Sequence, residues 1–233
     1  MANSSSPVVK PRPKRSRQPR IGPDSAGRLM SAPQFDRLTY DDCVEGYRYE
    51  LIRGVLVVSP AVSSAETSPN QDLGHILLTY QESHPEGGCL DATLPERDIF
   101  LPRNRRRADR VIWIGLGRVP DEKRDIPSIV IEFVSPGRRA AVRDYETKRD
   151  EYLGSGVKEY WVIDRFLRQM TVFRPGPDGP IATILPEGQS YETPLLPGFV
   201  LPLGRLLTKA DAWDRGEIPH LSKSNPASGG IDG

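Results

Sequence analysis

The segment Ile129-Val130-Ile131-Glu132-Phe133-Val134 places one carboxylate in the middle of an apolar run. Three apolar residues precede Glu132 and two follow it, a pattern typical of a strand that is buried on both faces of a sheet. A carboxylate in such a strand is costly unless it is paired, protonated or bound to a metal. Glu132 is therefore the first candidate for a functional residue.

Two more charged residues are expected near Glu132. Asp109 begins a second apolar segment, residues 109–114, and a helix predicted at about residues 140–153 carries Lys148 at the edge of its apolar side. Two acids and a lysine that come from two strands and one helix suggest a metal-dependent hydrolytic site. The remaining acids of this helix are expected to face water, namely Asp144, Glu146, Asp150 and Glu151.

The chemistry of phosphodiester hydrolysis fits this group of residues. The reaction needs a hard cation that neutralises the phosphate and lowers the pKa of an attacking water, and Mg²⁺ prefers oxygen ligands. We expect Asp109 and Glu132 to bind Mg²⁺ (or Mn²⁺), with the backbone carbonyl of Phe133 as a third ligand. Lys148 would orient or deprotonate the water, or stabilise the developing negative charge.

Composition predicts one domain between two tails. The chain has 233 residues and a formal net charge of +1, but residues 1–34 hold seven Lys or Arg and one acid. We expect a disordered basic N-terminal arm at residues 1–34, one domain at residues 35–215 and a flexible tail at residues 216–233. Any contact of the domain with DNA must then come from a local patch. The candidates that could clamp phosphates, or simply line a solvated loop, are Arg103, Arg105, Arg106 and Arg107.

The pattern of apolar residues predicts an α+β fold, in which most strands form one mixed sheet flanked by helices. A helix is expected to begin at Ser68-Pro69. Strands are expected at residues 47–52, 55–59, 90–94, 97–101, 107–114, 128–135, 158–164 and 169–174.

Two observations bear on the compartment. Cys43 and Cys89 lack a metal-type spacing and are expected to be reduced thiols of a cytoplasmic protein. No apolar run approaches the roughly 18 residues that a membrane-spanning helix needs, so no membrane partner is expected.

Several segments together resemble a known family. They are Ala108-Asp109, residues 131–136 (IEFVSP), Lys148 with Tyr152, Gly156-Val157, residues 160–164 (YWVID) and, upstream, residues 49–54 (YELIRG) and 57–60 (VVSP). Over residues 35–210 the chain is similar to the Uma-type restriction endonuclease family of the PD-(D/E)XK nuclease superfamily.

The resemblance implies a restriction-endonuclease-like core and magnesium-dependent cleavage of DNA. It implies that Asp109 and Glu132 are the two acids of the motif, and that Glu50 is an additional acid that holds a second metal or orients a ligand. Val134 stands where the motif has its lysine, and Lys148 from the following helix takes that place. Many relatives have a histidine near the start of the first long helix, where this chain offers Asn70.

Other interpretations remain open. Glu132 could belong to a buried ion pair with Lys148, and Glu50 could pair with Arg48 or Arg53. The chain could be a catalytically inactive, nuclease-fold DNA-binding or regulatory protein, or a two-carboxylate hydrolase that acts on another substrate. A homodimer would supply the two sites that cutting both DNA strands requires.

Overall fold

A mixed sheet of eight strands forms the centre of the computed structural model, which describes residues 19–216. Its strands are β1 (Tyr47–Ile52), β2 (Val55–Pro60), β3 (Leu90–Phe100), β4 (Asn104–Ile114), β5 (Ile129–Phe133), β6 (Glu159–Asp164), β7 (Gln169–Arg174) and β8 (Ile181–Pro186). Along the sheet the order is β2-β1-β4-β5-β6-β7-β8, and β3 pairs with β4. A smaller sheet pairs β9 (Ser190–Glu192) with β10 (Val200–Pro202).

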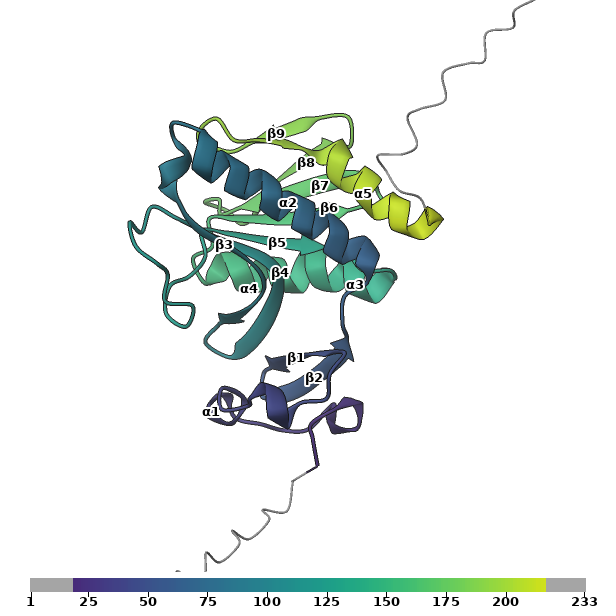
Figure 1. The fold of residues 1–233 in the computed structure, drawn as a ribbon. Helices are drawn as coiled ribbons and strands as arrows, with labels where there is room; N and C mark the ends of the chain where they lie inside the picture. The colour runs from purple at the N-terminus through teal and green to yellow at the C-terminus, as the bar shows by residue number, and fades with distance from the viewer. Residues whose placement is uncertain (1–18, 217–233) are drawn as a thin grey trace, which may run out of the picture.

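Helices cover both faces of the sheet (Figure 1). On one face lie α2 (Ser64–Ser83) and α5 (Leu203–Arg215). On the other face runs a continuous helical segment made of α3 (Arg138–Val142), the π-helical turn η4 (Arg143–Lys148) and α4 (Arg149–Gly154). The short helical turns are η1 (Pro23–Ser25), α1 (Ala32–Phe35), η2 (Tyr40–Asp42) and η3 (Gly87–Cys89). The predicted α+β class with a mixed sheet is thus confirmed.

The central strands determine where Glu132 points. β5 is antiparallel to β4 and parallel to β6, and the helical segment from α3 to α4 makes the crossover between β5 and β6. Because side chains alternate along a strand, Ile131 and Phe133 pack in the core under α2 and α5. Val130 packs in the core under α3 and α4, so Glu132 also faces that side.

The N-terminal boundary of the domain lies earlier than predicted. The isolated β-bridges Ile21↔Cys43 and Leu29↔Val55 join the first described residues to the hairpin β1–β2. Ile21 and Met30 are buried in a small core with Leu51 of β1. The prediction of one disordered arm over residues 1–34 is therefore wrong for residues 19–34, because an average over the basic segment hid the apolar residues that cover the hairpin. Residues 1–18 and 217–233 lie outside the described residues.

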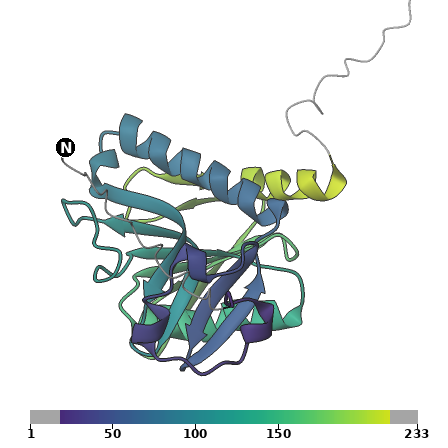
Figure 2. The same ribbon diagram turned by 60° about the horizontal axis from the view of Figure 1, so that its bottom comes forward.

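This N-terminal part and the hairpin β1–β2 form a lobe at the edge of the main body. Figures 1 and 2 show the lobe on the side away from α2 and α5. Its link to the main sheet is a short antiparallel pairing of β1 with β4, at Leu51↔Arg105 and Ile52↔Asn104.

Two other boundaries differ from prediction. α2 begins at Ser64 and contains Pro69, because Ser63 and Glu66 form a capping box in which the Ser63 backbone N–H donates to Oε2 of Glu66 at 2.9 Å. The two strands predicted at residues 90–94 and 97–101 are one long strand, β3, which pairs with β4 over its whole length.

Within residues 19–216 no helix is long and apolar enough to cross a membrane. Cys43 and Cys89 are free thiols.

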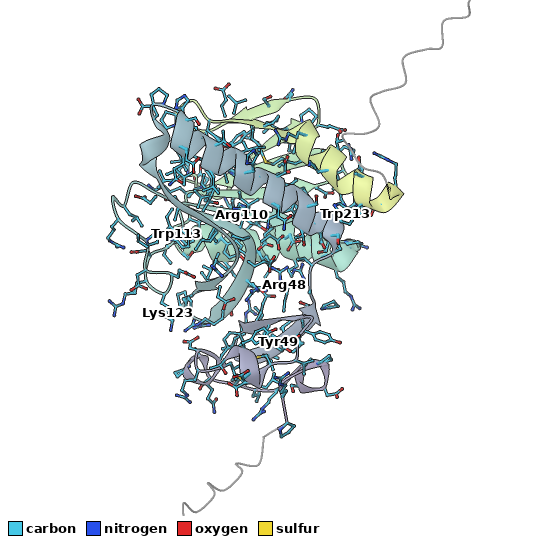
Figure 3. All side chains as sticks on the ribbon, viewed as in Figure 1. Arg48, Tyr49, Arg110, Trp113, Lys123 and Trp213 are labelled. Atoms are coloured by element: carbon cyan, nitrogen blue, oxygen red, sulfur yellow. The ribbon has the colours of Figure 1, made fainter. Side chains whose placement is uncertain are left out.

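A buried arginine fixes α2 to the sheet. Arg110 of β4 donates to Oδ1 of Asn70 at 2.7 Å, to the carbonyl oxygen of Asn70 at 2.8 Å and to Oγ1 of Thr93 at 3.0 Å. Figure 3 shows Arg110 beneath α2. Its partners are neutral, and burial lowers the pKa of this guanidinium to about 10.

The close approach of Arg110 predicts the effect of a substitution at Gly74. A Cβ at Gly74 would lie 2.5 Å from the nearest guanidinium nitrogen of Arg110. Gly→Ala inside a helix ordinarily stabilises by about 1 kcal/mol, but we expect Gly74→Ala to destabilise by about 1–3 kcal/mol because it displaces a buried, hydrogen-bonded cation. Gly154→Ala is the control, since a Cβ there meets no atom within 4 Å. Urea unfolding of both variants tests this, and equal stability of Gly74→Ala and wild type would contradict it.

Candidate active site

Glu132 is the centre of a buried cluster of polar side chains. Only 2% of the residue is exposed, and its Oε1 lies 2.9 Å from Nζ of Lys148 and accepts a hydrogen bond from the Tyr152 hydroxyl at 3.0 Å. Lys148 is also buried and lies 3.3 Å from Oδ1 of Asp144. The crossover helix thus supplies a lysine and a tyrosine to one oxygen of Glu132, and an acid to the other side of the lysine.

Asp109 lies next to Glu132 on the same face of the sheet. β4 and β5 pair through Arg110↔Ile131, so Asp109 and Glu132 are opposite each other one step further along the ladder. Oδ2 of Asp109 accepts a hydrogen bond from the backbone N–H of Phe133 at 2.7 Å. The structure therefore brings together the three residues that the sequence placed in one site: Asp109, Glu132 and Lys148.

The second carboxylate oxygen of Asp109, Oδ1, is buried beside an arginine but accepts no hydrogen bond. Oδ1 is buried and lies 3.0 Å from Nη2 of Arg48, yet it accepts no hydrogen bond. Nη2 of Arg48 donates instead to the backbone carbonyl of Arg107 at 2.9 Å, and Nε lies 3.3 Å from Oε2 of Glu96. Arg48 consequently balances the charge of Asp109 without occupying the lone pairs of Oδ1.

Burial and mutual repulsion perturb the acids of this cluster. Burial raises the pKa of Glu132 to about 8, and the charge of Asp109 adds to the shift while Lys148 opposes it. Burial also raises the pKa of Asp109, against the opposing charges of Arg48 and Lys148. For Lys148, burial acts to lower the pKa, but the carboxylates of Glu132 and Asp144 outweigh it and the pKa is raised. The cluster therefore favours a cation near its acids.

Glu50 is buried at the periphery of the cluster. Its Oε1 accepts a hydrogen bond from the backbone N–H of Arg107 at 3.1 Å and lies 3.8 Å from Nη1 of Arg106. The pairing considered from sequence, with Arg48 or Arg53, is not the one observed. Among residues 19–216 no group of three or more His, Cys, Asp or Glu side chains is placed to hold a metal together. Glu50 is therefore not positioned as a third carboxylate ligand beside Asp109 and Glu132.

Three of the four arginines proposed to clamp phosphates are engaged in ion pairs. Arg105 binds Asp36 at 2.8 and 3.0 Å, and its guanidinium lies over a phenylalanine ring. Arg106 is buried and binds Glu151 at 2.6 and 3.0 Å. Arg107 lies near Glu96 and Asp98, whereas Arg103 is exposed and has no ion pair among the described residues. These contacts favour a structural role for Arg105 and Arg106.

Asn70 of α2 also has a structural role. Its side-chain amide donates to the backbone carbonyl of Asp109 at 2.8 Å, while its Oδ1 accepts from Arg110. Asn70 thereby ties α2 to the backbone that carries Asp109.

Sequence reasoning missed Asp144 and the position of Arg48. Asp144 was expected to face water because a regular 3.6-residue period places it away from the sheet. Residues 143–148 instead form a π-helical turn, which changes the angular spacing and turns Asp144 inward, where it is buried. The spacing of Asp144 and Lys148, four residues apart, was a usable signal for their contact. Glu151, also expected to face water, pairs with Arg106.

Comparisons with protein families and with solved structures identify relatives of this chain. A family model described as "Putative restriction endonuclease" (Uma2) matches residues 32–204. The chain belongs to this family. It is similar in fold to a crystal structure titled as a putative nuclease belonging to DUF820 from Anabaena variabilis, with a TM-score of 0.59, 14% identity, and coverage of 76% of this chain and 97% of that chain. No curated protein matches the chain significantly.

The raised pKa of Glu132 predicts a dependence of stability on pH. The carboxyl has a pKa of about 8 in the folded protein and near 4.5 when unfolded, so the folded state holds a proton that the unfolded state has lost between these values. The free energy of unfolding should therefore decrease as pH rises from about 5 to 8. Glu132→Gln should abolish the part of this decrease that comes from ionisation of Glu132. Denaturant unfolding of both proteins in EDTA across this range measures the difference. Parallel profiles would contradict the buried, proton-binding state of Glu132.

Proposed function

We propose that this protein is a metal-dependent endonuclease that hydrolyses DNA phosphodiester bonds. The observation that carries the proposal is the pair of buried carboxylates, Asp109 and Glu132, which face the same side of two adjacent strands beside Lys148. Membership of the restriction endonuclease family supports nucleic acid as the substrate class. Cutting both strands of a duplex would require two such sites, which a homodimer would provide.

The residues present fit a hard divalent cation such as Mg²⁺ or Mn²⁺. Oδ1 of Asp109 is buried and accepts no hydrogen bond, so it retains lone pairs for a ligand. The donor set consists of oxygens alone, with Asp109, Glu132 and the backbone carbonyl of Phe133 as the groups that would hold the ion. Two carboxylates suffice for an ion that keeps several of its waters. When bound, such an ion would lower the pKa of a water and neutralise charge on the phosphate.

The surrounding side chains have separate tasks in this proposal. Lys148 has a raised pKa and is therefore cationic at neutral pH, which suits it to orient a water and to stabilise negative charge on the phosphate rather than to abstract a proton. Asp144 and Tyr152 position Lys148 and Glu132 through the contacts at 3.3 and 3.0 Å. Glu50 orients the start of β4 through its hydrogen bond with Arg107.

A second candidate is a nuclease-fold protein that binds DNA without cutting it. Its support is the internal pairing of the cluster, since Lys148 neutralises Glu132 and Arg48 lies against Asp109. In that case the same residues would serve only to stabilise the fold, and DNA binding would need no metal.

Plasmid cleavage decides between the two candidates. With Mg²⁺ or Mn²⁺ we expect the wild-type protein to nick or linearise supercoiled DNA, and EDTA to abolish the reaction. Asp109→Asn and Glu132→Gln should each lower the rate by about 100-fold or more, because each removes a charged ligand of the metal. Lys148→Met should lower it by about 10²–10³-fold, the scale seen when one charge-stabilising donor is removed.

The matched control is Glu187→Gln, which removes an acid that binds Arg168 far from the cluster. It should leave the cleavage rate unchanged. If wild type and all variants were equally inert while still retarding DNA on a gel, the endonuclease proposal would fail and the binding protein would remain.

A further inference from the structure

The ion pair between Arg48 and Asp109 is made without a hydrogen bond. Nη2 of Arg48 lies 3.0 Å from Oδ1 of Asp109, but it donates to the backbone carbonyl of Arg107 at 2.9 Å. Oδ1 is buried and accepts no hydrogen bond within residues 19–216. Attraction between charges therefore holds Arg48 against the acid, and moving the guanidinium away would break no hydrogen bond to Asp109.

Arg48 keeps its positive charge in this position. Burial acts to lower its pKa, but the carboxylates of Asp109, Glu132 and Glu96 outweigh burial, and the pKa is raised above that of a free arginine. Because a guanidinium does not lose its proton in proteins, Arg48 cannot make room for a second cation by deprotonation. A cation can take its place beside Oδ1 only if the side chain moves.

A divalent ion bound to Asp109 would come close to this charge. Mg²⁺ approaches a carboxylate oxygen to about 2.0–2.1 Å, and Nη2 of Arg48 is only 3.0 Å from the same oxygen. Repulsion between two cations at such separations is strong in a buried site, because protein screens charge less than water does. Arg48 therefore opposes binding of the ion for as long as it stays against Oδ1.

A neighbouring carboxylate offers Arg48 another position. Oε2 of Glu96 lies 3.3 Å from Nε of Arg48. Arg48 also belongs to the lining of a hollow of about 670 Å³ between the lobe and the hairpin β3–β4, and its side chain is 16% exposed. A displacement toward Glu96 and this hollow would separate Arg48 from Asp109 while its charge stays paired.

Lys148 on the helix side is held differently. Its Nζ lies 2.9 Å from Oε1 of Glu132 and 3.3 Å from Oδ1 of Asp144, and its side chain is enclosed by the protein. With these two carboxylates, Lys148 is a fixed component of the cluster. Arg48 instead shares its nearest carboxylate, Asp109, with the proposed metal, so it is the cation that the metal would displace.

We propose that Arg48 is a resident counter-cation of Asp109 that competes with the divalent metal, which binds only as Arg48 withdraws from Oδ1 toward Glu96. The inference rests on the proposed function, because it concerns the metal of that same site. It assigns Arg48 to the control of metal binding and not to contact with the substrate. In the wild-type protein the metal is consequently bound more weakly than the two carboxylates alone would bind it.

Titration with Mn²⁺ alone tests the competition. Isothermal titration calorimetry of the full chain measures the Mn²⁺ affinity of each variant without DNA and independently of cleavage. Arg48→Gln should bind Mn²⁺ about tenfold or more tightly than wild type, because the repelling charge is gone. Arg48→Lys keeps a charge and should gain less affinity than Arg48→Gln. The titrations are run at about pH 8, so that Asp109 without its counter-cation does not simply take up a proton.

Arg105→Gln is the matched control for Arg48→Gln. The Arg105 side chain is 13% exposed and pairs with a single acid, Asp36, away from the cluster. Its loss removes the same charge from the protein, but we expect the Mn²⁺ affinity to stay within about twofold of wild type because distant charges are screened. A gain that is confined to Arg48→Gln is then an effect of position and not of net charge.

Glu96→Gln tests the same competition with the opposite sign. It should weaken Mn²⁺ binding about three- to tenfold, because Arg48 loses the carboxylate toward which it withdraws. Asp98→Asn is its control. Glu96 and Asp98 lie 3.2 and 3.4 Å from the guanidinium of Arg107, but among the described residues only Glu96 of these two also pairs with Arg48.

The outcomes separate this inference from the endonuclease proposal. Asp109→Asn should lower the Mn²⁺ affinity about 100-fold or more, which locates the binding at this site. If Arg48→Gln binds Mn²⁺ no more tightly than wild type while Asp109→Asn loses it, the competition is refuted and the metal site remains. If Arg48→Gln fails to fold, equal affinities of Glu96→Gln and Asp98→Asn overturn the inference. If no folded variant binds Mn²⁺, this inference and the metal dependence of the proposed nuclease both fail.

Discussion

The burial of Glu132 is the constraint on which the rest of this structure depends. A carboxylate in the central strand of a sheet loses its hydration, and this burial raises the pKa of Glu132. Lys148 and Tyr152 from the crossover helix compensate for it at 2.9 and 3.0 Å. Replacing such a buried pair by apolar residues is often neutral or stabilising, so stability alone gives little reason to keep it. The proposed metal site gives a better explanation of this arrangement. In that proposal Glu132 and Asp109 of the neighbouring strand would hold one divalent cation together.

Charge balance around the two acids is local and asymmetric. On the helix side, Lys148 lies between Glu132 and Asp144 and is enclosed by the protein. On the lobe side, Arg48 lies against Asp109 but directs its hydrogen bond to a backbone carbonyl. Glu132 is therefore engaged through Oε1 by both Lys148 and Tyr152, whereas Oδ1 of Asp109 accepts no hydrogen bond. Oδ1 of Asp109 therefore keeps lone pairs for a further ligand, as the proposed metal site requires.

The sequence predicted the fold class and the three central residues because both depend on local signals. An apolar run that contains one acid indicates a buried charged strand wherever it occurs, and the resemblance to a nuclease family supplied the order of the acids. The contacts of Arg105 and Arg106 could not be predicted, because their partners Asp36 and Glu151 are distant in sequence and are brought near only by the fold. Asp144 was misplaced because the π-helical turn departs from the period on which the argument relied.

β4 connects the candidate site to the opposite face of the sheet, because consecutive residues of a strand point to opposite sides. Asp109 faces the crossover helix, while Arg110 faces α2 and is held there by Asn70. The same Asn70 side chain donates to the backbone carbonyl of Asp109. Asn70 thus fixes the strand at Asp109, and it does so from the opposite face of the sheet. Asn70 therefore contributes to the placement of Asp109.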